Sequence, residues 1–232
     1  MLRGPTWRRL LPDIYLYAGA YRETDQRMWC QAVALTLPLG GAIAGLSAAY
    51  LWGADLIPLA ERSRVSVALP ATARMRTHAH IDITRSALPP SDVTQLDGLP
   101  VTTAVRTAFD VGRRTPRTAA VIVLDALMNR GVVKQSELSD YIDTHSGWPG
   151  VARLREVLSL AEPLSESPTQ TRLRLLLLDA GAPPPVAQYE VHDGEGRSLG
   201  RVALAYPRWK IALECRGDQQ PVDPAAPRRD LA

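Results

Sequence analysis

Hydrophobic and polar residues that favour helices, chiefly leucine and arginine, fill the run from Thr171 to Ala180 in the C-terminal third of the chain. Ser167 can accept a hydrogen bond from a free backbone N–H, Pro168 suits the first helical position, and Gln170 can reach back to complete a capping box. Gly181 and the prolines that follow it cannot continue a helix. The pattern therefore predicts one helix that begins after Ser167 and ends near Ala180.

After this helix, apolar and polar residues alternate in three short runs, as is typical of β-strands. The runs lie at residues 187–191, 199–206 and 209–213. Asp193 and Gly194 fit the turn of a hairpin between the first two runs. The third run ends on Glu214, so the pattern predicts a helix followed by a meander that ends on a carboxylate.

The longer N-terminal part mixes both periodicities, which indicates an α+β fold. Helical patterns cover residues 25–37, 45–51, 104–110, 118–129, 135–143 and 151–161, and strand patterns cover residues 14–17, 64–69 and 77–83. Ser136 is expected to cap the fifth helix. His78 and His80 share one face of the strand at 77–83, but they have no acidic or cysteine partner nearby, so we interpret them as ordinary strand residues.

Composition limits the location and the partners of the protein. The chain has 232 residues, 46% of them hydrophobic and 22% charged, with a formal net charge of +3 and a pI near 9.1. This excess permits nucleic-acid binding but is too small to argue for it alone. Cys30 and Cys215 lie far apart, and no secretory signal is found before them, so we expect a reduced protein of the cytoplasm.

One apolar stretch, residues 32–52, contains no charged side chain and is long enough to raise the question of a membrane span. Pro38 and several glycines interrupt it, and such residues divide a helix. We therefore expect two short buried helices and no contact with a membrane.

Residues 97–110 read Asp-Gly-Leu-Pro-Val-Thr-Thr-Ala-Val-Arg-Thr-Ala-Phe-Asp. This resembles the pattern Gly-Leu-Pro-Val-Thr-x-x-x-Arg-Thr-x-x-Asp of AbiEi-type antitoxins and of related nuclease-like proteins. The resemblance implies an AbiEi-like half of helices and strands over residues 1–162, with DNA or a partner toxin as its binding partner. Family members often carry a small winged-helix segment ahead of this part, which we do not recognise here.

The capped helix and the meander resemble a second family, the PD-(D/E)XK nucleases related to very-short-patch-repair endonucleases. Their activity would need Mg²⁺ held by carboxylates on neighbouring strands. The family's acidic positions fall here on Gln170, Ala203 and Arg216, and the family histidine falls on Gln220. Only Glu214 remains of the carboxylate set. The resemblance therefore implies a truncated restriction-endonuclease-like domain over residues 163–220.

The function implied is that of a degenerate, catalytically inactive relative of these DNA endonucleases, with no cofactor unless activity and its Mg²⁺ survive. Glu214 is then a remnant, and a lone carboxylate at a strand end is usually a solvated or salt-bridged side chain. The alternatives are an antitoxin-like or transcriptional regulatory protein that binds DNA or a partner toxin, and an active nuclease with rearranged ligands.

Four arginines of the C-terminal part are candidates for a phosphate-binding face: Arg172, Arg174, Arg201 and Arg208. Ordinary surface charge explains them equally well. Because phosphate contacts depend on counterion release, we expect DNA binding to be weak, non-specific and sensitive to salt.

The last segment, residues 221–232, has three prolines and no helical or strand pattern, which predicts a disordered tail. A single inserted base near codon 220 would also replace a polar helical continuation by this proline-rich sequence. A frameshifted or truncated product is therefore a further hypothesis.

Overall fold

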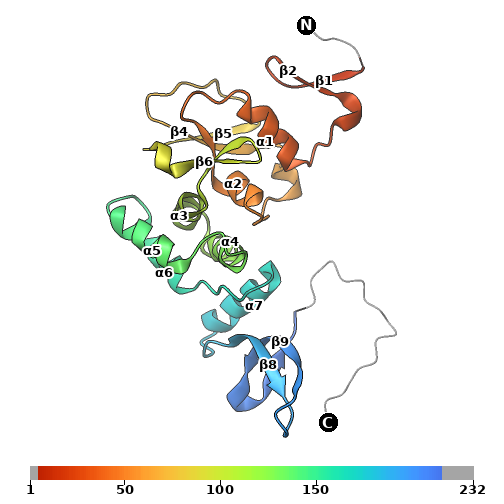
Figure 1. Ribbon diagram of the computed structural model, residues 1–232, viewed down its shortest axis with the longest axis vertical. Helices are drawn as coiled ribbons and strands as arrows, with labels where there is room; N and C mark the ends of the chain where they lie inside the picture. Colours follow the sequence, from red (N-terminus) through yellow and green to blue (C-terminus); the bar gives the residue numbers. More distant parts are fainter. Residues whose placement is uncertain (1–4, 216–232) are drawn as a thin grey trace. The chain divides into compact units, whose positions relative to one another are not determined.

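The computed structural model describes residues 5–215, and the chain divides into two compact units between Pro163 and Leu164 (Figure 1). The described part is a mixed α+β fold, as the sequence predicts. The predictions made for Arg216, Gln220 and the tail at 221–232 lie outside the described residues.

The first unit is built around a five-stranded sheet with the order β5-β4-β3-β7-β6. Its strands are β3 (Ala42–Ile43), β4 (Val65–Leu69), β5 (Ile81–Arg85), β6 (Val93–Leu96) and β7 (Leu99–Thr102). The pairs β4–β5 and β3–β7 are parallel, and the other two pairs are antiparallel. Asp97 and Gly98 close the β6–β7 hairpin with φ angles of 50° and 76°, a turn geometry that favours Asp-Gly.

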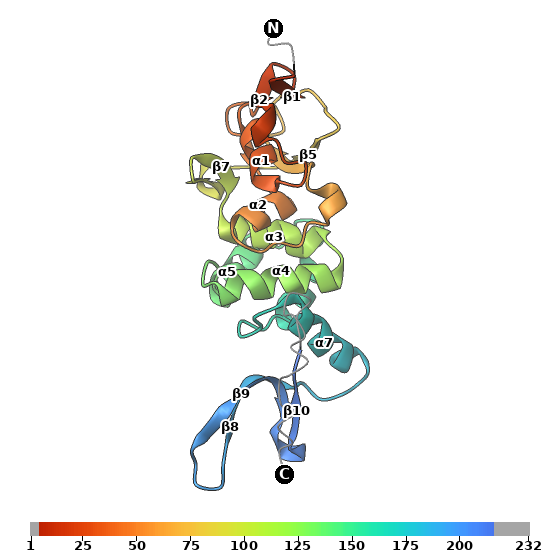
Figure 2. The same ribbon diagram turned by 90° about the vertical axis from the view of Figure 1, so that its right-hand side faces the viewer.

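The helices of the first unit are α1 (Gln26–Ala34), α2 (Gly45–Leu51), α3 (Ala104–Arg114), α4 (Arg117–Asn129), α5 (Gln135–Thr144) and α6 (Val151–Ser159). Helix α3 packs against α2, α4, α5 and α6, and Figure 2 shows it between α2 and α4. A hairpin of β1 (Trp7–Leu11) and β2 (Ile14–Tyr17) precedes α1 and contacts it through β1.

A glycine allows the close approach of α3 to α6. Gly112 is buried in α3, and a Cβ atom added there would lie 2.2 Å from Leu154 Cδ1 of α6. Only a residue without a side chain fits this contact, because real carbon atoms do not approach so closely. Leu154 and Phe109 are both fully buried in the interior that this contact closes.

The second unit consists of α7 (Pro168–Asp179), β8 (Val186–His192), β9 (Ser198–Tyr206) and β10 (Ile211–Leu213). The strands form an antiparallel sheet in the order β10-β9-β8. The predicted cap is confirmed, because Ser167 Oγ accepts a hydrogen bond from the backbone N–H of Gln170. The helix and the hairpin that follow it also lie where the sequence predicts them.

Several predicted boundaries are wrong. Residues 207–209 form a 3-10 helix and Lys210 has a φ of 54°, so the third strand begins at Ile211 and not at Trp209. The strand predicted at 77–83 is β5, which begins only at Ile81. His78 and His80 therefore lie before the strand and not on it. Lys134 precedes α5, so Ser136 lies inside the helix and does not cap it. Strands β1, β6 and β7 were not predicted.

The apolar stretch at 32–52 contains the end of α1 and the whole of α2, so the two expected helices are found, and the short strand β3 between them was not predicted. None of the helices among residues 5–215 combines the length and the apolar character that crossing a bilayer requires. Cys30 is buried, Cys215 is half-buried, and both are free thiols.

We predict that the sheet of the second unit opens more readily than the helices of the first. Strands β8 and β10 are its edges, and the large apolar side chains of Leu199, Trp209 and Ile211 are 60%, 53% and 47% exposed. In hydrogen exchange of the full chain, amides of β9 and β10 should exchange at least about tenfold faster than those of α3 and α4. Equal protection of both regions in a monomer would contradict this.

Candidate functional site

The side chain of Arg106 lies at the centre of a buried polar network and has no exposed surface. Its Nε atom donates to Asp110 Oδ2 at 2.8 Å, and its Nη1 atom donates to Asp92 Oδ2 at 2.5 Å and to the carbonyl oxygen of Ala87 at 3.0 Å. Its Nη2 atom donates to Ser86 Oγ at 2.9 Å. All three guanidinium nitrogens therefore have acceptors, as a buried guanidinium requires.

The two carboxylates of the network have further partners. Asp110 Oδ1 accepts hydrogen bonds from Arg113 Nη2 at 2.5 Å and Nε at 3.0 Å, while Arg113 Nη1 reaches the carbonyl oxygen of Pro149 at 3.2 Å. Tyr141 donates its hydroxyl proton to Asp92 Oδ2 at 2.8 Å. The network therefore links the chain before β6, helices α3 and α5, and the segment before α6.

Aromatic rings cover the network. Phe109, Tyr141, His145 and Trp148 pack with ring centroids 4.1 to 5.7 Å apart. The Cζ atoms of Arg106 and Arg113 each lie 5.1 Å from the centroid of the Trp148 ring, within the range of a cation–π contact. The sequence analysis missed this cover, because the rings are spread over 40 residues of the chain.

These contacts determine the protonation states of Arg106 and Tyr141. Burial alone would lower the pKa of Arg106, but the charges and hydrogen bonds of Asp110 and Asp92 raise it, so the guanidinium stays charged. Burial and the hydrogen bond to Asp92 raise the pKa of Tyr141 well above its usual value. Tyr141 is therefore a neutral donor throughout the physiological range.

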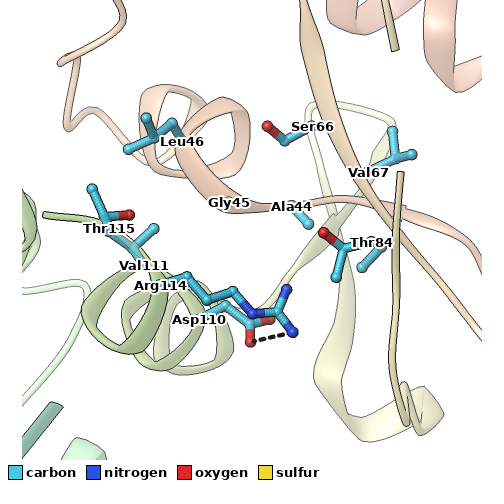
Figure 3. Close-up of a pocket in the computed structure, with 11 residues that line it drawn as sticks. Ala44, Gly45, Leu46, Ser66, Val67, Thr84, Asp110, Val111, Arg114 and Thr115 are labelled. Carbon is cyan, nitrogen blue, oxygen red and sulfur yellow. Dashed lines mark ion pairs between the residues drawn. The ribbon is translucent and has the colours of Figure 1, made fainter. Parts of the chain in front are cut away.

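A polar cavity of about 180 Å³ lies beside this network (Figure 3). Its walls come from the chain around Gly45, from Ser66 of β4, from Thr84 of β5 and from the last residues of α3. Two charged side chains line it, Asp110 and Arg114. Figure 3 shows the ion pair that these two side chains form across the cavity wall, with 3.9 Å between Arg114 Nη2 and Asp110 Oδ1.

Arg114 is held less firmly than the other arginines of the network. Its Nη2 atom is 3.9 Å from Asp110 Oδ1, beyond hydrogen-bonding distance, and its side chain is 37% exposed. Burial lowers the pKa of Arg114, Asp110 partly offsets this, and the charges of Arg113 and Arg106 lower it further. The positive charge of Arg114 is thus incompletely compensated.

A second hollow, a groove of about 520 Å³, lies between the turn of the β1–β2 hairpin and the segment from Arg74 to His78. Arg74 and Arg76 are exposed, and neither has an ion pair or hydrogen bond within residues 5–215. Asp13 is the acidic residue in the lining. We name this feature the basic groove.

The two histidines near the groove are not a metal site. His80 stacks on Trp29 with ring centroids 4.2 Å apart, and its Nδ1 atom lies 2.9 Å from the carbonyl oxygen of Ser63. Burial, followed by the charges of His80 and Arg9, lowers the pKa of His78. These contacts are typical of structural histidines, but the two residues lie in a turn and not on the predicted strand.

The nuclease-like positions come together only in part. Glu214 Oε1 accepts a hydrogen bond from the backbone N–H of Ala203 at 3.0 Å, so Glu214, directly after β10, lies beside Ala203 of β9. Gln170 Oε1 accepts from the backbone N–H of Glu166 at 2.9 Å, one residue before the N-cap Ser167, so Gln170 reaches back as predicted but does not close a capping box. Among residues 5–215, His, Cys, Asp and Glu side chains form no group of three that could hold a metal ion.

The four arginines expected to face phosphate differ in burial. Arg174 is buried, with 6% of its surface exposed, so it does not belong to an exposed binding face. Arg172, Arg201 and Arg208 are exposed, and the guanidinium of Arg208 lies over the Trp209 ring at 5.7 Å. A role for these three in nucleic-acid binding stays a prediction.

Both the sequence and the structure are similar to those of known proteins. A family model described as AbiEi antitoxin C-terminal domain matches residues 41–160. The proteins MT2308 and Rv2248 of Mycobacterium tuberculosis, both uncharacterized, are each 28% identical to this chain over 219 residues, covering 94% of this chain and 78% of the relative.

Among solved structures, the crystal structure of the RV2827C protein from Mycobacterium tuberculosis is similar, with a TM-score of 0.42 and 19% sequence identity. The similarity covers 73% of this chain and 64% of that one. None of these findings supports a relationship to PD-(D/E)XK or very-short-patch-repair endonucleases.

We predict that Arg106→Ala destabilises the first unit by roughly 3–5 kcal/mol, because it leaves Asp92 and Asp110 buried without their main counter-ion. Arg27→Ala is the matched control: it breaks the Arg27–Asp97 pair, whose side chains are 43% and 60% exposed, and should cost at most about 1 kcal/mol. Hydrogen exchange of α4 in urea measures both. Similar costs for the two variants would show that the network does not stabilise the unit.

Proposed function

The chain belongs to the AbiEi antitoxin C-terminal domain family, and we propose that it is an antitoxin-like protein that acts by binding a partner toxin. The matched region, residues 41–160, includes helix α3, the buried network and the Arg74–His78 side of the basic groove. The proposal replaces the interpretation of the chain as a degenerate endonuclease, which the comparisons do not support.

The basic groove is the feature that best supports a macromolecular partner. The chain from Arg62 to Ile81 contains four arginines and no acidic residue, and two of these arginines, Arg74 and Arg76, have no partner in the described part of the chain. Met75 and Leu11 add apolar surface to the same lining. Arginine beside apolar surface is typical of protein interfaces, and the charge calls for an acidic partner surface.

The contacts within the buried network favour a binding function for this domain over a catalytic one. Asp92 and Asp110 each accept hydrogen bonds from arginine, and Tyr141 donates to Asp92, so neither carboxylate is free to take a proton from a substrate. These charges hold the helices together beneath the surface. We therefore assign them to the stability of the domain and assign recognition to the exposed arginines.

A second candidate function is DNA binding, and the same unpaired arginines favour it. Guanidinium groups bind phosphate oxygens readily, and the groove lies on a unit that carries a small positive excess. With a net charge of only +3, we expect this binding to be weak and non-specific.

We predict that the chain suppresses the growth arrest caused by its partner toxin, with the protein encoded beside it as the first one to test. Arg74→Glu with Arg76→Glu should weaken the complex at least about tenfold, mainly through slower association, because it reverses the charge of the groove. Arg130→Glu with Arg155→Glu, exposed and outside the groove, is the matched control. Equal weakening by both pairs, measured by surface plasmon resonance and growth rescue, would refute the groove as the interface.

For DNA, we predict weak binding to short duplexes of unrelated sequence, with an affinity that falls steeply as salt rises. Removing Arg74 and Arg76 should reduce the slope of log K against log salt by about 2, roughly one unit for each lost phosphate contact. Fluorescence anisotropy at several salt concentrations measures this slope. Tight, sequence-selective binding that survives raised salt would contradict the prediction and favour a transcriptional regulator.

A further inference from the structure

We propose that the cavity beside the buried network binds a small phosphate-containing anion through the guanidinium group of Arg114. This site is separate from the basic groove: none of the residues that line one hollow lines the other. The inference therefore does not depend on which macromolecule the groove binds.

The charges around the cavity favour an anion. Three guanidinium groups, those of Arg106, Arg113 and Arg114, surround two carboxylates, those of Asp92 and Asp110. Three positive charges less two negative ones leave one positive charge unbalanced. Asp110 already contacts Arg106 and Arg113 at 2.5 to 3.0 Å, so the unbalanced charge lies at Arg114, on the cavity wall.

Hydroxyl groups line the cavity around Arg114. Ser66, Thr84 and Thr115 contribute side chains to the lining, and their hydroxyl groups make no hydrogen bond to any residue within 5–215. Figure 3 shows the Thr84 and Thr115 hydroxyl groups on opposite sides of the cavity, with Arg114 between them on the α3 side. One charged donor with several neutral donors around it suits the several oxygens of a phosphate group.

The backbone at Gly45 keeps this space open. Its φ of 55° is a left-handed conformation that favours glycine, and an added Cβ would lie 3.3 Å from Ser66 Cβ. The resulting cavity of about 180 Å³ is several times larger than the roughly 30 Å³ that one water molecule occupies in the liquid. Its walls are α2, β4, β5 and α3, so it admits a small anion and not a nucleic-acid duplex.

The partial exposure of Arg114 gives a ligand access to its charge. The group is 37% exposed, whereas Arg106 and Arg113 are almost completely enclosed, with side-chain exposures of 0% and 4%. Burial lowers the pKa of Arg114, and Asp110 does not fully offset this effect and that of the neighbouring arginines. An anion in the cavity would supply the missing counter-charge.

Isothermal titration calorimetry of the full chain tests the proposal with inorganic phosphate, methyl phosphate and acetate, each at the same ionic strength set with chloride. We expect saturable binding of inorganic phosphate and methyl phosphate at one site per chain, and at least tenfold weaker binding of acetate. Arg114→Gln should weaken phosphate binding at least tenfold, because it removes a charge-assisted hydrogen bond. Arg130→Gln, an equal loss of charge outside the cavity, should leave the affinity unchanged.

A second variant separates loss of the ligand from loss of the fold. Thr84→Val keeps the shape of the side chain and removes one hydroxyl group, and it should weaken phosphate binding by a smaller factor while the melting temperature without phosphate stays within a few degrees. If phosphate does not bind, or binds equally to the unmodified chain and to Arg114→Gln, the proposal is wrong and Arg114 only complements the carbonyl end of α3. If methyl phosphate fails where inorganic phosphate binds, the ligand is the free ion.

Discussion

Arg106 has no contact with water, and a buried guanidinium is stable only when acceptors and counter-charge surround it. Its partners come from the chain before β6, from its own helix and from the indole of Trp148, which are distant from one another in the sequence. Removing either carboxylate would leave the buried guanidinium with less counter-charge. The relative positions of the β6–β7 hairpin and helices α3, α5 and α6 therefore depend on this one side chain.

This constraint separates the charges of the first unit into two groups with different roles. One group consists of ion pairs that Arg106 and Arg113 form with Asp92 and Asp110. These pairs hold the helices in one arrangement. The charges of Arg74 and Arg76 have no partner within residues 5–215, and the charge of Arg114 is only partly compensated by Asp110 at 3.9 Å, so these three charges remain available to other molecules. An antitoxin-like role fits a domain of this kind, because a rigid support holds a charged surface ready for a partner.

Much of the fold was predictable from local signals. The capping residue Ser167, the stop at Gly181 and the helical patterns of the N-terminal part give five helices close to their observed bounds. The stretch from Arg106 to Asp110 could also be recognised, because it resembles part of a pattern of AbiEi-type antitoxins. Its role could not be predicted, because Asp92, Tyr141 and Trp148 become its neighbours only through long-range packing, which has no periodic signal.

Other errors have local causes. The β6–β7 hairpin was missed although Asp97 and Gly98 are a strong hairpin pair, because Pro100 weakens the pattern of the second strand. The strand predicted at Trp209 fails because Pro207 favours a 3-10 turn and Lys210 adopts a left-handed conformation. The cavity at Arg114 gave no signal in the sequence, because its hydroxyl groups come from two strands and the end of a helix.

The contact at Gly112 has a consequence for how this domain can change over evolutionary time. A side chain at this position would force Leu154 of α6 to move, and the residues directly before α6 include Pro149, the acceptor for Arg113, and Trp148, the ring above both buried arginines. Separating the two helices would therefore admit water to the charges as well as leave a gap in the core. The close packing at Gly112 therefore protects an ionic network as well as the core, and a substitution that separated the helices would have an electrostatic cost in addition to a packing cost.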